Sequence, residues 1–263
     1  ISLNADVIRT SKFQWTSDFN IGFNRNRVTE LYGGKPELKG LKRLEEGRDM
    51  DEWYLREWAG VDPANGSPLW YTTDENGKRT TTDSYNKADR VYCGSAAPKF
   101  TGGWMNSFSY KGFTLTANFD FVYGNLLYNQ SRELLDSDGA YADYNSMKLK
   151  SGWKRWEKEG DIATHPKAIN GGNKNSNKSS SRYLEKGNYF SLRNLSLGYS
   201  IPEKLCGKLG LQRVNVSCSA DNLFTLTPFS GVSPQLSDSS TDGYAGTIYP
   251  LSRRIVFGLN VSF

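Results

Sequence analysis

The stretch that decides the fold is LSRRIVFGLNVSF, residues 251–263. Apolar side chains occupy every second position of it, at Ile255, Phe257, Leu259, Val261 and Phe263. The residues between them are small or polar, and Val256 is the one exception. A period of two indicates a β-strand whose two faces differ. We therefore expect a strand with one apolar and one polar face, and Phe263 lies in phase with the apolar face.

The same alternation occurs in two pairs of neighbouring segments. Residues 1–7 and 13–23 flank a short turn at 10–12, which predicts the pairs Arg9–Phe13, Val7–Trp15 and Leu3–Phe19. The second hairpin turns at Lys111-Gly112, where glycine provides the unusual backbone angle of a two-residue turn. Its predicted pairs are Tyr110–Phe113, Phe108–Leu115 and Trp104–Phe119. In this register the apolar side chains of each hairpin share one face.

Three further strands are expected at 188–201, 213–227 and 251–263, which makes seven in all. Their connections alternate in length. Residues 10–12, 111–112 and 202–212 are the shorter connections, whereas 28–99, 125–187 and 228–249 are long. If successive strands run antiparallel, every long connection lies at one end of the sheet. Transmembrane β-barrels have this asymmetry, with short periplasmic turns and long extracellular loops.

The expected apolar faces contain no charged residue. They comprise 34 positions, and the 23% charged composition of the chain would place about eight charged residues there. Arginine or lysine facing lipid at mid-bilayer costs ~2–4 kcal/mol, which accounts for such a deficit. Aromatic residues near both ends of this face suit two interfacial girdles: Trp15 and Tyr110 at one end, Trp104 and Tyr123 at the other. A β-sandwich core would also give one apolar face, so a sandwich remains the alternative.

Length and composition set further bounds. The chain has 263 residues, a net charge of +5 and 37% hydrophobic residues, which allows one large domain. Apolar runs are too short for a transmembrane helix, which needs about 20 residues. The basic residues are scattered, so we expect no nucleic-acid partner. Because Ile1 already falls in a strand pattern, with no Met and no signal peptide, we expect a fragment of a longer protein.

Candidate functional residues lie mainly in the long connections. Seven aromatic residues there either pack the loops together, which is the favoured interpretation, or contact a partner or substrate: Trp53, Tyr54, Trp58, Trp70, Tyr71, Trp153 and Trp156. The single histidine, His165, is expected to be solvated, and no motif for a nucleophile, phosphate or zinc is present, so neither an enzyme nor a cofactor is expected.

Two other groups of residues could bind metal or form disulfides. The segment DSDGAYAD, with Asp136, Asp138 and Asp143, lacks the spacing of an EF-hand and predicts a hydrated turn instead of a metal site. Three cysteines, at positions 93, 206 and 218, form no zinc motif and no dense disulfide framework. We expect Cys218 to act as a small apolar residue of a strand.

Six segments together resemble the C-terminal part of a SusC/RagA-type TonB-dependent outer-membrane transporter. They occur in the order of that family: FQWTSDFNIGFNRNRVTEL (13–31), AGVDPANGSPLWY (59–71), PKFTGGWMNSFSYKGFTL (98–115), YLEKGNYFSLRNLSLGYSIP (183–202), SADNLFTLTPFSGVSPQ (219–235) and YPLSRRIVFGLNVSF (249–263). The resemblance implies an all-β fold, in which residues 1–263 are a single partial domain. Its seven strands would be the last of a 22-stranded antiparallel transmembrane barrel, as an open sheet, and the plug domain would lie outside the chain.

The resemblance also implies a function and partners. We expect active uptake of a glycan or peptide oligomer across the outer membrane, with a SusD-like surface lipoprotein as a lid and the TonB complex acting through the plug. Outer-membrane lipid would surround the barrel, and Phe263 would be the signal that the barrel-assembly machinery recognises. The alternative function is that of a soluble β-sandwich module that binds carbohydrate through exposed tryptophan and tyrosine.

Overall fold

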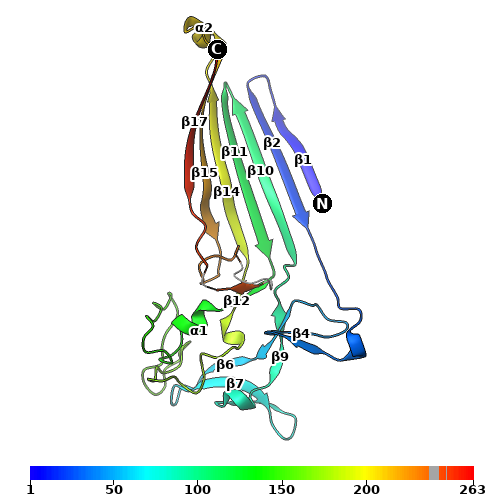
Figure 1. The fold of residues 1–263 in the computed structure, drawn as a ribbon, viewed down its shortest axis with the longest axis vertical. Coiled ribbons are helices and arrows are strands. Elements are labelled where there is room, and N and C mark those ends of the chain that lie inside the picture. Colours follow the sequence, from blue (N-terminus) through cyan, green and yellow to red (C-terminus); the bar gives the residue numbers. More distant parts are fainter. Residues whose placement is uncertain (237–242, 247) are drawn as a thin grey trace.

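The computed structural model describes residues 1–236, 243–246 and 248–263. One long antiparallel sheet forms one end of the molecule, and loops with short strands form the other (Figure 1). The order of its seven strands is β1 (Ser2–Arg9), β2 (Phe13–Gly22), β10 (Phe100–Tyr110), β11 (Phe113–Tyr123), β14 (Tyr189–Ser200), β15 (Arg213–Leu226) and β17 (Arg254–Ser262). All seven predicted strands are confirmed. The predicted loop 228–249 includes residues 237–242 and 247, which lie outside the described residues.

The register of the two hairpins follows the predictions except at one bulge. In the β10–β11 hairpin all three predicted pairs are present. In the β1–β2 hairpin Leu3 pairs with Phe19 as predicted. The pairs predicted for Val7 and Arg9 are wrong by one residue, because Trp15 pairs with Ile8 instead. A β-bulge between Asp6 and Ile8 inserts the extra residue, and the alternating pattern carries no sign of it.

A second irregularity lengthens the apolar face of the sheet. Asn118 pairs with Asn194, whereas Phe119 pairs with Leu192, so Arg193 is an extra residue in β14. Beyond this bulge the apolar positions of β14 change from odd to even numbers, whereas those of β15 stay even, and the same face continues with Phe190, Leu192, Phe224 and Leu226. The apolar face therefore extends toward the loop end as far as Phe190 and Leu226.

The apolar face of the sheet is covered with aromatic rings and is exposed. The ring of Phe119 lies 5.7 Å from Trp104 and 5.2 Å from Phe190, and Phe257 on β17 is 79% exposed. A β-sandwich would cover this face with a second sheet. Among residues 1–236, 243–246 and 248–263 no such sheet packs on it, so the sandwich alternative is wrong.

The loop end contains three small sheets. The first has the order β3 (Glu37–Lys39), β4 (Lys42–Leu44), β5 (Glu52–Arg56) and β9 (Arg90–Ser95). The second consists of β6 (Trp58–Val61), β7 (Pro68–Thr73) and β8 (Arg79–Thr82), and the third of β13 (Leu184–Lys186), β12 (Leu126–Asn129) and β16 (Tyr244–Ala245). Within residues 28–99, the turns that end at Gly66 and Gly77 are closed by hydrogen bonds from the backbone nitrogens of these glycines to the carbonyls of Asp62 and Asp74.

The helices are short. Helix α1 (Ser131–Leu135) lies in the loop end, and α2 (Glu203–Lys208) lies beyond the opposite end of the large sheet (Figure 1). Three single 3-10 turns complete the described elements, at Tyr32–Gly34, Tyr85–Lys87 and Ser181–Tyr183. Within the described part of the chain, no helix has the length and apolar character needed to cross a membrane.

Candidate functional site

The polar face of the large sheet carries a row of charged residues near the loop end. Arg193 on β14 lies 3.5 Å from the carboxylate of Asp120 on β11. Further along the row, Asp221 on β15 accepts hydrogen bonds from Asn194 at 2.7 Å and from Arg254 on β17 at 2.7 Å. The row therefore crosses four neighbouring strands, and its charges alternate in sign. Alternation in the strands gives this face its polar character, as predicted.

In the loop end, beyond this row of charges, a buried aromatic core holds the loops together. Trp53 of β5 is 0% exposed, and its indole nitrogen donates to the carbonyl of Leu126 at 3.0 Å. The ring of Trp53 lies 5.8 Å from Tyr128 and 5.1 Å from Tyr244. The core thus joins segments that are far apart in the sequence, which fixes the loop layer against β12 and β16.

The predicted aromatic site residues do not converge on one site. Trp70 packs edge-on against Trp58 and Tyr85 with ring centroids 5.6 and 5.5 Å away. Trp53 and Trp70 have no exposed surface and Trp156 is 8% exposed, so these three pack the loops. The remaining four are half-buried, and each has a cation near its ring: Tyr54 with Arg43, Trp58 with Arg182, Tyr71 with Arg79, and Trp153 with Arg132. Contact of these four with a substrate or partner stays a prediction.

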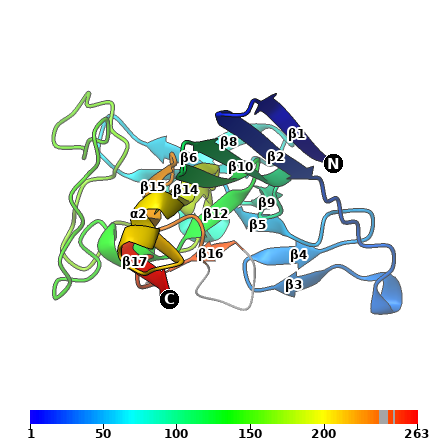
Figure 2. The ribbon, with the colours of Figure 1, turned by 90° about the horizontal axis from the view of Figure 1, so that it is seen from above.

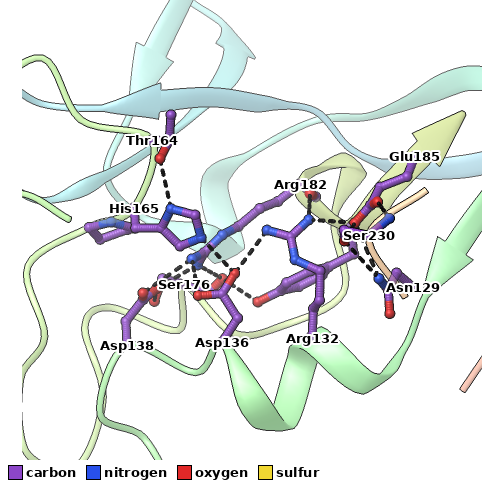
Figure 3. A network of polar contacts seen from close by, with 12 residues as sticks. Asn129, Arg132, Asp136, Asp138, Thr164, His165, Ser176, Arg182, Glu185 and Ser230 are labelled. Atoms are coloured by element: carbon purple, nitrogen blue, oxygen red, sulfur yellow. Dashed lines mark hydrogen bonds and ion pairs between the residues drawn. The ribbon is translucent and has the colours of Figure 1, made fainter. Parts of the chain in front are cut away.

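A cluster of buried charges stabilises the connection between β11 and β14 (Figure 3). Asp136, at the end of α1, accepts a hydrogen bond from Arg132 at 2.8 Å, and its carboxylate lies at hydrogen-bond distance, 2.9 Å, from His165 Nε2. Asp138 accepts from Arg155 at 2.7 Å and also from Arg182. The prediction of a solvated histidine is wrong, because His165 is 1% exposed.

The prediction of a hydrated turn is also wrong for two of its three residues. Asp136 and Asp138 are buried, whereas Asp143 is exposed. Arginine side chains neutralise the two buried carboxylates, because the local segment folds back onto Arg155 and Arg182. These ion pairs could not be predicted from a local sequence pattern, because the carboxylates and their arginines are up to 46 positions apart in the chain.

The charges in the cluster balance. Three arginines, Arg132, Arg155 and Arg182, meet three carboxylates, Asp136, Asp138 and Glu185. Burial alone raises the pKa of Asp136, but the hydrogen bond with His165 and the charge of Arg182 outweigh burial and hold that pKa below its usual range. Because arginines already occupy the carboxylate oxygens, the cluster suits a structural role better than metal binding.

Two neighbouring cavities lie where the large sheet meets the loops. The first has a volume of about 670 Å³ and is lined by charged residues of both signs, among them Arg25, Arg48, Asp49 and Glu52. The second, of about 630 Å³, shares Arg25 and Asp49 with it and is more apolar. Sequence analysis missed these cavities, because residues 25–27 and 47–52 belong to different parts of an irregular loop.

Within the first cavity, some charges are paired and others are not. Arg48 holds Glu52 with two hydrogen bonds of 2.7 and 3.0 Å, and Asp49 accepts one from Ser95 at 2.8 Å. Arg25 is exposed and forms no ion pair among the residues that the structure describes. A cavity of this size with charged walls and a free guanidinium can hold a polar, charged oligomer segment.

The chain was compared with known proteins. No family model matches it. TonB-dependent receptors P39 and P3 of Formosa agariphila are each 28% identical to it over its whole length, and the chain covers 30% and 28% of them. Among solved structures, the RagAB peptide transporter superposes with a TM-score of 0.83 at 26% identity, with 100% of this chain and 28% of that chain covered. In sequence and in fold, the chain is similar to TonB-dependent receptors of the SusC/RagA type. It spans less than a third of the length of these relatives.

The similarity to these receptors explains why the two faces of the sheet differ. In the outer membrane the apolar face of the receptor segment meets lipid and the polar face lines the interior of the barrel. The extracellular position of the long connections stays a prediction. Phe263 follows β17 and is exposed, and its role in barrel assembly stays a prediction.

Proposed function

We propose that the full-length protein takes up a nutrient oligomer across the outer membrane and that the TonB complex energises this uptake. The observation that carries the proposal is the similarity of the whole chain to TonB-dependent receptors and to the RagAB peptide transporter, in sequence and in fold. The relatives are receptors and transporters, so we propose no catalytic role. In this proposal the TonB complex acts through a plug domain of the full-length protein.

A peptide is the favoured class of substrate. The cavity at the junction of sheet and loops has charged walls of both signs, which suit the charged termini and side chains of a peptide. A neutral glycan would need exposed aromatic faces for stacking, and two of the predicted tryptophans, Trp53 and Trp70, are fully buried. A SusD-like lipoprotein over the extracellular loops is the proposed partner, because those loops form a continuous layer at one end of the barrel wall.

Uptake by cells that lack the full-length gene tests this proposal. Cells would be given fluorescent charged oligopeptides or neutral oligosaccharides, with and without a protonophore that abolishes TonB energisation. We expect deletion to remove energy-dependent peptide uptake and the wild-type gene to restore it. Arg25→Glu should lower peptide uptake without lowering the amount of protein in the outer membrane. Loss of oligosaccharide uptake alone would overturn the choice of peptide, and unchanged uptake of both would overturn the transport function.

A further inference from the structure

A groove of about 530 Å³ lies on the membrane-facing side of the sheet, at its loop end. Apolar residues of β10, β11, β14 and β15, together with Pro228 just after β15, form most of its walls; those of the strands are Phe100, Phe121, Tyr123, Phe190 and Leu226. Cross-strand pairing puts Phe121 beside Phe190 and Phe190 beside Leu226, so these side chains share the apolar face. The groove is therefore part of the outer surface of the barrel wall and not of its interior.

The depth of the groove matches the boundary between lipid chains and headgroups. It lies where β11 and β15 end, and Tyr123 and Phe100 stack there with ring centroids 5.0 Å apart. Aromatic rings gather at this level of a membrane because they have an apolar body and tolerate the polar interface. Leu226, at 63% exposed, remains open at the end of β15. An apolar chain lying in the groove would have its polar end at the extracellular loops.

A basic segment lies at that polar end. The ammonium group of Lys150 donates to the carbonyl of Pro228, which lines the groove, at 3.3 Å. Residues 148–155 contain four basic residues and no acidic one, and Lys154 and Arg155 are already paired with Asp161 and Asp138. Lys148 and Lys150 are exposed, and neither forms an ion pair with a carboxylate in the part of the chain that the structure describes. The loop that carries them extends sideways beyond the outline of the large sheet (Figure 2).

We propose that this groove, with Lys150 at its extracellular end, binds an outer-leaflet lipid whose headgroup carries phosphate. The apolar walls hold part of an acyl chain, and Lys150 attracts the phosphate. A substrate of the transporter has no access to the groove, because the groove faces away from the barrel interior. A neutral lipid would use the apolar walls but not the lysine. The inference is independent of what the transporter carries.

Native mass spectrometry of the full-length protein in mild detergent tests the proposal. Bis-phosphorylated lipid A and its dephosphorylated counterpart would be titrated against the wild type and three variants. We expect the wild type to retain phosphorylated lipid A in preference to the dephosphorylated form. Lys150→Ala should weaken retention of the phosphorylated form about fivefold. Lys148→Ala, which removes an exposed lysine two positions away, should have a smaller effect.

A groove-filling variant separates the two parts of the site. Leu226→Trp should lower binding of both lipids, because it takes the space of the acyl chain while leaving Lys150 in place. Equal retention of both lipids by the wild type, together with no effect of Lys150→Ala, would overturn the proposal. A Leu226→Cys variant in native membranes gives a second check. If it forms a disulfide-linked dimer instead of reacting with a thiol-reactive lipid probe, a second copy of the protein occupies the groove and the lipid assignment is wrong.

Discussion

At the scale of single residues, the loop layer depends on charges that are hidden from solvent. Arg182 is buried and bridges Asp136 and Asp138, with 3.3 Å to the first and a direct hydrogen bond to the second. A buried carboxylate without its partner is costly because neither water nor another charge compensates it. The same residues lie around His165, so one substitution affects the whole connection between β11 and β14.

We expect Arg182→Ala to destabilise this loop region by about 3–5 kcal/mol, since it leaves two buried carboxylates short of a partner. Hydrogen exchange of the full-length protein in detergent would measure this as faster exchange in residues 131–183. Lys174→Ala is the matched control, because the Lys174–Asp83 ion pair is about half exposed on both sides. An exposed pair contributes about 0–1 kcal/mol. If hydrogen exchange became faster by the same factor in both variants, the buried charges around Asp136 and Asp138 would not be a stabilising centre.

At the scale of the strands, the two faces of β11 should respond differently to substitution. Phe119 packs between Trp104 and Phe190 on the apolar face, whereas Asp120 lies on the polar face and accepts a hydrogen bond from Tyr189 at 3.0 Å. Phe119→Arg places a charge toward lipid and should reduce folding stability by ~2–4 kcal/mol. Asp120→Asn keeps an acceptor for Tyr189 and should cost at most about 1 kcal/mol. A refolding titration of the full-length protein into lipid vesicles measures both, and similar losses would contradict the assignment of the faces.

The strands were predictable because each carries its own pattern. The register of the β10–β11 hairpin follows from the two-residue turn at Lys111-Gly112, which leaves little freedom in pairing. The bulges at Val7 and Arg193 were not predictable, since an extra residue changes the parity of a strand without a residue type that marks it. Alternation thus identifies strands and faces, whereas bulges need three-dimensional contacts.

In the loop layer, by contrast, most of the arrangement depends on contacts that the sequence does not reveal. Turns such as Asp74–Gly77 are local, and their Asp, Asn and Gly residues are typical of turns. The cluster around Asp136, and the cavity around Arg25 and Asp49, depend on contacts between distant segments. Charged residues there look like solvated loop residues in the sequence, because burial of a charge is decided by its partners and not by its neighbours in the chain. The aromatic residues were identified as loop-packing candidates, and the fully buried ones have that role.

At the scale of the whole molecule, the arrangement predicts the topology in the membrane. The β7–β8 hairpin lies at the far end of the loop layer, and α2 lies beyond the opposite end of the large sheet (Figure 1). If the long loops are extracellular, these two positions are on opposite sides of the outer membrane. Both Gly77 and Gly210 are exposed, and the space around each is open, so an insertion beside either should not disturb packing.

An epitope tag inserted after Asn76 of the full-length protein should therefore be labelled by antibody on intact cells. A tag inserted after Gly210 should be labelled only once the outer membrane is permeabilised, because the membrane then no longer excludes the antibody. The segment 170–181, although rich in polar residues, is a poor insertion site, since Ser176 is buried and donates to Asp138 at 2.6 Å. Equal total labelling after permeabilisation would verify that both tagged proteins reach the membrane. Labelling of the Gly210 tag but not the Asn76 tag on intact cells would reverse the orientation of the sheet and with it the assignment of the groove beside Lys150 to the outer leaflet.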